Sequence, residues 1–322
     1  MVVLDGYTTN PGDLSWEGFK KYGELTVYDR TSFNVNEEIK VIKNIGDAEA
    51  VFTNKTPITR NILEQVPKLK YIGVLATGYN VVDIKAAKEK GIIVTNIPNY
   101  GTQAVAQMTF ALLLELCNHV GSHNEAVKSG VWANSLDWCF WNDQLVELAG
   151  KNFGIIGYGK IGRAVGKIAQ AFGMNVLAFS RSKNSLLESE GVQYTDLESL
   201  LQEADVISLH CPLTEDTQNL INAKTISKMK ENVMIINTAR GQLIDEEALA
   251  AALNDKKIAG AAIDVAAVEP IKDNNPLLTA RNCMITPHIS WAPKEARKRL
   301  LDIALCNLIS FLNKQTINVV NY

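Results

Sequence analysis

The stretch that decides the fold runs Phe153-Gly154-Ile155-Ile156-Gly157-Tyr158-Gly159-Lys160-Ile161-Gly162. Its apolar start predicts a buried strand, its glycines predict a tight turn, and residues 163–172 continue with a helical pattern. In such a turn the first glycine permits the bend, the second lets a pyrophosphate approach the backbone, and the third lets the helix pack on the strand. Because the helix N-terminus presents free N–H groups, we predict that this turn binds a dinucleotide through Gly157, Tyr158, Gly159, Lys160, Ile161 and Gly162.

Short apolar runs alternate with helical windows on both sides of this turn, which predicts an α/β protein with parallel sheets. The predicted strands are Val2–Asp5, Leu25–Asp29, Ala50–Asn54, Tyr71–Thr77, Ile92–Ile97, Phe153–Gly157, Asn175–Ser180, Asp205–His210, Val233–Asn237, Ile258–Asp264 and Cys283–Thr286. A long helical stretch over 101–130 and an aromatic-rich loop over 131–148 separate the two blocks. A domain boundary is therefore expected near residue 100, and the pattern alone does not assign the last helix, 293–312, to either block.

The composition limits the kinds of partner. The chain has 322 residues and a formal net charge of -3, so no basic excess favours nucleic acid. The most apolar helical window, 104–120, carries Gln107 and Glu115 and falls short of a membrane span. We therefore expect neither nucleic acid nor a membrane as partner.

The cysteines and the N-terminus indicate a cytoplasmic protein. Five cysteines are scattered without a C-x-x-C motif, which is typical of free thiols in a reducing compartment. The first residues enter an apolar strand directly, without the basic segment of a signal peptide. His119 and His123 have a spacing compatible with a metal, but no H-E-x-x-H pattern accompanies them, and we predict no metal.

The residues after the second strand of the dinucleotide block bear on cofactor choice. An acidic residue expected near position 180 would hold the ribose 2′-hydroxyl of NAD, but the chain reads Ser180-Arg181-Ser182. These donors suit a 2′-phosphate, which favours use of NADPH at least as well as NADH. The alternative is that Arg181 stacks on adenine and does not discriminate.

Three later segments place reactive side chains at predicted strand ends. Arg240, Glu269 and His288 would meet beyond the carboxyl edge of the sheet, beside the glycine turn. Reduction of a 2-oxo acid needs a cation for the carboxylate and an acid for the carbonyl oxygen. Arg240 can supply the first and His288 the second, with Glu269 holding the imidazole and favouring its charged form. Each residue alone would more often be a surface or packing residue, so the prediction rests on their joint occurrence.

Four motifs in this order resemble the D-isomer-specific 2-hydroxyacid dehydrogenase family over nearly the whole chain. They are the glycine turn, Thr238-Ala239-Arg240-Gly241, Asp264-Val265 with Glu269-Pro270, and Pro287-His288. The resemblance implies a flavodoxin-like substrate domain, 1–98 plus 292–322, and a Rossmann-type dinucleotide-binding domain, 99–291. It also implies a homodimer through residues 101–150.

The resemblance carries further site residues. The cofactor would contact Cys211, Pro212, Thr217, Thr238, Ala239 and Asp264, the last on the nicotinamide amide side. The substrate carboxylate would bind at the backbone N–H groups of Thr77 and Gly78, with Asn54 close by, and Trp138 or Trp141 would reach the substrate from the neighbouring subunit.

Within the family, three short segments favour the branch that reduces hydroxypyruvate to D-glycerate, and glyoxylate as well. They are Thr53-Asn54-Lys55-Thr56-Pro57, Leu75-Ala76-Thr77-Gly78-Tyr79-Asn80 and Cys139-Phe140-Trp141. Two alternatives stay open at this point: a dehydrogenase for another 2-oxo acid such as pyruvate, and a dinucleotide-sensing corepressor, which resembles the family and can keep the same three residues.

Overall fold

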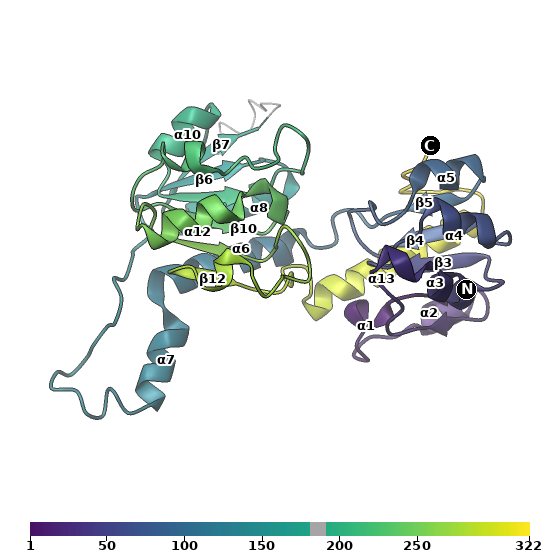
Figure 1. Cartoon of the computed structure of the whole chain (residues 1–322), viewed down its shortest axis with the longest axis horizontal. Coiled ribbons are helices and arrows are strands. Elements are labelled where there is room, and N and C mark those ends of the chain that lie inside the picture. The colour runs from purple at the N-terminus through teal and green to yellow at the C-terminus, as the bar shows by residue number, and fades with distance from the viewer. Residues whose placement is uncertain (181–190) are drawn as a thin grey trace. The chain divides into compact units, whose positions relative to one another are not determined.

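The computed structural model describes residues 1–180 and 191–322. The chain divides into two compact units, Met1–Gly101 with Trp291–Tyr322 and Thr102–Ser290. Each unit is an α/β layer structure built on a parallel sheet, as the alternation of apolar runs predicts (Figure 1).

The first unit contains a five-stranded parallel sheet in the order β2-β1-β3-β4-β5. This is the flavodoxin-like order, in which successive strands are added on one side of β1 and then, from β3 onward, on its other side. The strands are β1 (Val2–Val3), β2 (Thr26–Val27), β3 (Ala50–Thr53), β4 (Tyr71–Val74) and β5 (Ile93–Thr95), and the helices are α1 (Gly6–Thr9), α2 (Glu17–Lys20), η1 (Val35–Glu37), α3 (Glu38–Ile45), α4 (Arg60–Gln65), α5 (Ile84–Glu89) and α13 (Lys294–Leu312).

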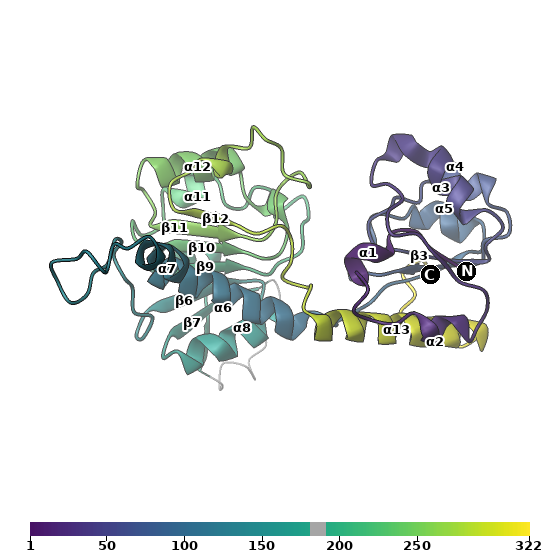
Figure 2. The same cartoon turned by 90° about the horizontal axis from the view of Figure 1, so that it is seen from below.

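The two faces of this sheet are covered by different helices (Figure 2). The helices α3, α4 and α5 close one face over an aliphatic core. On the other face, an aromatic chain runs from Phe19 through Phe52 and Tyr71 to Phe311 of α13. The C-terminal helix therefore belongs to the unit that the N-terminal strands form.

The second unit contains a seven-stranded parallel sheet in the order β12-β11-β10-β9-β6-β7-β8. Its order reverses between β6 and β9, as in a Rossmann fold. The strands are β6 (Asn152–Ile156), β7 (Asn175–Phe179), β8 (Val192–Tyr194), β9 (Val206–Leu209), β10 (Met234–Asn237), β11 (Gly260–Ile263) and β12 (Cys283–Ile285), and the helices are α6 (Thr102–Asn118), α7 (Val120–Lys128), α8 (Lys160–Ala171), α10 (Leu197–Glu203), α11 (Ala223–Ile226), η2 (Gly241–Leu243), α12 (Glu246–Asn254) and η3 (Pro276–Leu278).

Two buried clusters hold the helices of this unit on its sheet. One joins α10, α11 and α12 to one face, and the other joins α6 and α8 to the opposite face. Beyond α6, α7 and the loop that follows it project away from the sheet of this unit (Figure 1). The aromatic-rich segment thus lies outside the packed body of the unit.

The sequence prediction differs from the structure at two places. The stretch 101–130 is not one helix, because His119 adopts a left-handed φ of 49° and divides it into α6 and α7. Across this break, Oε1 of Glu115 accepts a hydrogen bond from the backbone N–H of Gly121 at 2.9 Å. The edge strand β8 was not predicted, since it has three residues and buries only Val192.

Candidate active site

The glycine turn between β6 and α8 has the backbone shape that its sequence predicts. Gly157 has a φ of +98°, and a Cβ there would lie 2.4 Å from the backbone nitrogen of Cys211. A Cβ on Gly162 would lie 2.4 Å from the carbonyl oxygen of Gly157. At Gly159, the N-cap of α8, a Cβ would meet nothing within 4 Å. The turn is therefore tight where it bends and open where a pyrophosphate would approach.

Two of the other predicted cofactor residues, Ser180 and Cys211, lie beside this turn. The backbone N–H of Gly157 donates to Phe179 at 2.8 Å, which brings the half-buried Ser180 beside the turn. Thr217 donates its hydroxyl to the carbonyl of Pro212 at 2.8 Å in the loop after β9. Arg181 and Ser182 lie outside the described residues.

His210 lies between the end of β9 and Cys211, and it is a neutral packing residue. Burial lowers its pKa from 6.5 to about 3, and its Nε2 lies 2.8 Å from the hydroxyl of Ser208. The imidazole therefore carries no charge toward the turn at neutral pH.

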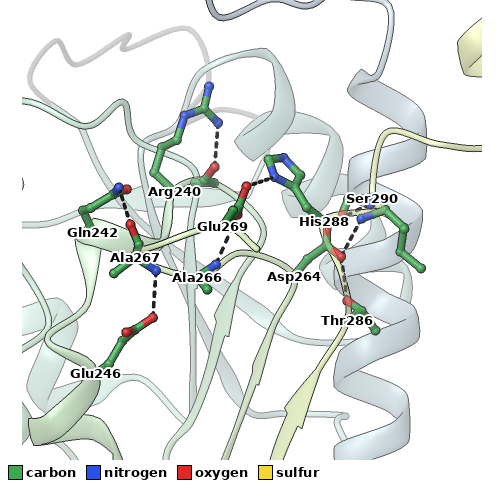
Figure 3. A network of polar contacts seen from close by, with 12 residues as sticks. Arg240, Gln242, Glu246, Asp264, Ala266, Ala267, Glu269, Thr286, His288 and Ser290 are labelled. Carbon is green, nitrogen blue, oxygen red and sulfur yellow. Dashed lines mark hydrogen bonds and ion pairs between the residues drawn. The ribbon is translucent and has the colours of Figure 1, made fainter. Parts of the chain in front are cut away.

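The three predicted catalytic residues follow neighbouring parallel strands. Arg240 comes three residues after β10 ends, Glu269 follows β11, and His288 comes three residues after β12 ends. Since β10, β11 and β12 are adjacent and parallel, their carboxyl ends share one edge. The structure thus places all three residues at one edge of the second unit (Figure 3).

Glu269 and His288 form a direct pair. The Nδ1 of His288 lies 2.7 Å from Oε2 of Glu269, and the other carboxylate oxygen accepts the backbone N–H of Ala266 at 3.2 Å. Both side chains are partly exposed, at 27% for His288 and 36% for Glu269. The contact fixes the orientation of the ring and leaves Nε2 as its second polar atom.

Arg240 is exposed and anchored through its backbone. Asn237 donates its side-chain amide to the carbonyl of Arg240 at 2.8 Å and accepts the N–H of Ala239 at 3.0 Å. Within residues 1–180 and 191–322, the guanidinium donates one bond, to the carbonyl of Ala239 at 2.7 Å. Most of its five N–H donors can therefore face a carboxylate ligand.

The buried carboxylate of Asp264 holds the segment that carries His288. Its Oδ1 accepts the hydroxyl of Thr286 at 2.6 Å and the N–H of Ile289 at 2.8 Å, and its Oδ2 accepts the N–H of Ser290 at 2.7 Å. His288 lies between these anchors with a left-handed φ of 55°, which costs about 1–2 kcal/mol in an L-residue. Asp264 is fully buried, so its predicted contact with the nicotinamide amide stays a prediction.

The predicted substrate residues of the first unit follow β3 and β4. Asn54 is 4% exposed and donates its side-chain amide to the carbonyl of Leu75 at 2.6 Å, so it ties the two loops together. Thr77 donates its hydroxyl to the carbonyl of Ile97 at 2.7 Å. The backbone N–H groups of Thr77 and Gly78 have no acceptor among residues 1–180 and 191–322.

The sequence reasoning missed two acidic residues that build these loops. Asp5, two residues after β1, accepts the backbone N–H groups of Asn54, Lys55 and Thr56. Burial nevertheless raises the pKa of the Asp5 carboxyl above its ordinary value. Glu246, in the second unit, likewise accepts a backbone N–H group, that of Ala267. An acid directly after a strand is a usable signal for the first, whereas the second resembles an ordinary acidic residue in a first helical turn.

The remaining predictions concern metals, membranes and the tryptophans. His123 uses both ring nitrogens, one near the carbonyl of His119 at 2.8 Å and one accepting the N–H of Asn142 at 3.2 Å. In the described part of the chain, no cluster of three potential metal ligands is found, and no helix has the length and hydropathy to cross a membrane. Trp138 and Trp141 are 86% and 65% exposed on the loop after α7.

Comparison with known proteins identifies several relatives of the chain. Residues 110–290 match the model of the D-isomer specific 2-hydroxyacid dehydrogenase, NAD binding domain. A hydroxypyruvate reductase of Blautia hydrogenotrophica is 58% identical, over 100% of this chain and 99% of that protein. A glycerate dehydrogenase of Methylorubrum extorquens is 42% identical, over 87% of this chain and 88% of that protein. The solved D-lactate dehydrogenase of Aquifex aeolicus, complexed with NAD and lactic acid, has 30% identity and a TM-score of 0.85, over 100% and 99% of the two chains.

Proposed function

Because the chain belongs to the D-isomer-specific 2-hydroxyacid dehydrogenase family of NAD(P)-dependent oxidoreductases, we propose that it reduces hydroxypyruvate to D-glycerate, and glyoxylate to glycolate. The observation that carries this proposal is the pair of Glu269 and His288 at 2.7 Å, on the same sheet edge as Arg240. Similarity to a hydroxypyruvate reductase over the full chain supports the substrate.

The glycine turn fits a nicotinamide dinucleotide. The open space at Gly159 and the N-terminus of the twelve-residue α8 suit a pyrophosphate, and Ser180 lies where the adenosine ribose would follow. Bound in its reduced form, the dinucleotide supplies a hydride to the carbonyl carbon of the substrate. We propose that the residues predicted from the motifs, including Thr217, Thr238 and Ala239, line this site.

His288 is the proton donor in this proposal. As the carbonyl carbon receives hydride, its oxygen gains negative charge and takes the proton from Nε2 of the imidazolium. Glu269 on Nδ1 orients the ring and favours the charged form that the reduction consumes. A second proton from solvent restores the imidazolium for the next turnover.

Each unit offers donors of its own for a substrate carboxylate in this proposal. Arg240 offers a bidentate contact and helps to polarise the carbonyl group. The backbone N–H groups of Thr77 and Gly78 supply donors from the first unit, which the buried amide of Asn54 keeps in register. Accordingly, we propose that the first unit is the substrate domain and the second the cofactor domain, with boundaries near 98 and 292.

The environment of position 180 supports NADPH as a cofactor at least as good as NADH. Ser180 lies beside the glycine turn with no carboxylate of its own, so it does not repel a 2′-phosphate. Hydroxyl and guanidinium donors follow it in the sequence.

A homodimer is proposed through the arm formed by α7 and the loop after it. Nine residues of α6 are buried, whereas α7 has no buried residue. Of the segment 101–150 expected at the dimer interface, we therefore propose that about residues 120–146 form the contact surface. On this arm Leu136 is fully exposed and Trp138 is 86% exposed. Large exposed apolar side chains in one segment are typical of an interface, and Trp138 or Trp141 would approach the partner's substrate.

The cysteines support a reducing compartment such as the cytoplasm. All five are free thiols. Burial raises the pKa of the Cys117 thiol to about 11 and that of Cys283 to about 12, so neither is a reactive thiolate at neutral pH.

The experiment that tests the function is a comparison of substrates and cofactors. Hydroxypyruvate, glyoxylate and pyruvate would each be supplied with NADH and with NADPH, and oxidation of the cofactor followed by absorbance. We expect the highest kcat/KM with hydroxypyruvate, and a His288→Ala variant that binds cofactor without turnover. A preference for pyruvate, or cofactor binding without turnover on any of the three, would contradict the proposal.

A further inference from the structure

One residue in the loop that carries Glu269, Ala267, is held at both of its backbone polar groups. Glu246 Oε1 accepts the backbone N–H of Ala267 at 2.8 Å, and Gln242 Nε2 donates to the carbonyl of Ala267 at 2.7 Å. Figure 3 shows the two side chains reaching Ala267 from opposite sides. Few degrees of freedom remain for this residue, because both groups are fixed by different elements, η2 and α12.

Ala267 is next in the chain to a residue that bonds to the Glu269–His288 pair. Ala266, the residue before it, donates its N–H to Oε1 of Glu269 at 3.2 Å, and Oε2 of Glu269 contacts His288. A displacement of Ala267 therefore moves the donor on which the Glu269 carboxylate rests.

The backbone of Ala266 and Ala267 also packs against Gly241, the residue after Arg240. A Cβ on Gly241 would lie 1.9 Å from the carbonyl carbon of Ala266 and 2.3 Å from the nitrogen of Ala267. The two segments thus pack backbone against backbone, which only glycine permits. Gln242, the next residue, reinforces this contact.

The second oxygen of Glu246 prevents it from turning away. Oε2 accepts the side-chain amide of Asn275 at 2.9 Å, and Oδ1 of Asn275 in turn accepts the N–H of Leu277 at 3.0 Å. Asn275 cannot reverse its amide without losing this bond. Glu246 therefore faces two donors, which suits a carboxylate and no neutral side chain of the same shape.

We propose that Glu246, assisted by Gln242, is a positioning residue: by holding the backbone of Ala267, it fixes the position of Glu269 relative to His288. The inference rests on the proposed function, because it assigns Glu246 to the proton donor of that reaction. Because both carboxylate oxygens of Glu246 are engaged by Ala267 and Asn275, we expect its effect on the proton step and not on cofactor affinity.

Glu246→Gln tests the inference with almost no change of shape. The new NH₂ group faces either the N–H of Ala267 or the amide of Asn275, so one of the two bonds is lost. The matched control is Glu247→Gln, which removes an equal charge from the same helical turn at an exposed side chain. We expect kcat for hydroxypyruvate reduction to fall about tenfold in Glu246→Gln alone, with KM for NADH within about twofold of wild type.

The pH profile separates positioning from general weakening of the fold. If Glu269 is displaced, the imidazolium loses support, and the basic limb of the kcat profile moves to lower pH. The ring signals of His288 would also change position in the NMR spectrum, which contains the signals of four histidines and needs no turnover. Wild-type kcat and an unmoved basic limb in Glu246→Gln would overturn the inference.

Two further outcomes are distinguishable. If the wild-type chain turns over no 2-oxo acid, the proposed function fails, and the NMR ring signals of His288 in Glu246→Gln decide the positioning role: unchanged signals overturn it. If Glu246→Gln shows no cooperative unfolding transition, Gln242→Met replaces it, since that change removes only the bond to the Ala267 carbonyl. Gln242→Met must then shift the basic limb in the same direction, and an unchanged limb overturns the inference.

Discussion

Replacing Asp264 by asparagine should damage both stability and turnover. The amide oxygen can keep the two bonds of Oδ1, to Thr286 and Ile289, only if the NH₂ group faces the N–H of Ser290. A buried donor is then left without an acceptor, which costs about 2 kcal/mol. The opposite orientation leaves two donors unpaired.

The two retained bonds also weaken, because their acceptor is no longer charged. Loss of charge assistance roughly halves such bonds, so about 1–2 kcal/mol more is lost. We therefore expect Asp264→Asn to destabilise the second unit by about 3–4 kcal/mol. For a unit of this size that corresponds to a fall in Tm of about 6–16 °C.

The kinetic effect follows from the backbone of His288. Its φ of 55° stores about 1–2 kcal/mol of strain, which the bonds of Asp264 on either side hold in place. When the anchors weaken, the loop relaxes away from Glu269, and a shift of about 1 Å would lower kcat/KM about a hundredfold.

Calorimetry and steady-state kinetics would measure these effects together. Asp273→Asn is the matched control, because Asp273 is exposed in the neighbouring loop. Wild-type Tm and kcat in Asp264→Asn would refute the reasoning. Weaker NADH binding with unchanged Tm and kcat would instead assign Asp264 to the nicotinamide amide.

Four further predictions address separate parts of the molecule. His288→Gln should lower kcat by about 10²–10⁴ while leaving NADH binding intact by fluorescence titration, and a fall below tenfold would contradict proton donation. Ser180→Asp should change the kcat/KM ratio of NADPH to NADH about tenfold or more toward NADH, and an unchanged ratio would show that position 180 does not select. The Arg297 guanidinium holds the pKa of the Asp13 carboxyl below its ordinary value of 3.8. Their bond therefore stabilises the fold fully above pH 3.8, and this stabilisation is lost as the pH falls through the lowered pKa. Asp13→Asn should make the free energy of unfolding depend less on pH below 3.8, and a pH dependence parallel to that of the wild type would argue against this reasoning. Leu136→Asp should shift the sedimentation of a dimer toward monomer, and an unchanged mass would exclude the arm as the interface.

The predictable part of this protein is the part with strong local patterns. The parallel α/β fold with two sheets was predicted from buried runs such as Ala50–Thr53, which need no tertiary information. The glycine turn was readable because Gly157 and Gly162 meet steric demands that no other residue satisfies. The convergence of Glu269 and His288 followed from strand ends sharing an edge.

The unpredicted part depends on contacts that the sequence does not display. The left-handed residue at the helix break is His119 and not Gly or Asn, so the sequence gives no clear signal for its positive φ. Asp5 and Glu246 act on backbone groups about 49 and 21 residues away, and their type alone does not reveal such partners.

The return of the C-terminal helix has a consequence for synthesis on the ribosome. Sheet β1–β5 is made first, yet its aromatic face is completed by Phe311, and Asn307 donates to the carbonyl of Asn96 at 2.9 Å. The second unit, by contrast, is complete once residue 290 has emerged. Domains usually fold in the order of their translation. Here we expect the order to invert, with the strands β1–β5 keeping one face uncovered until α13 has emerged.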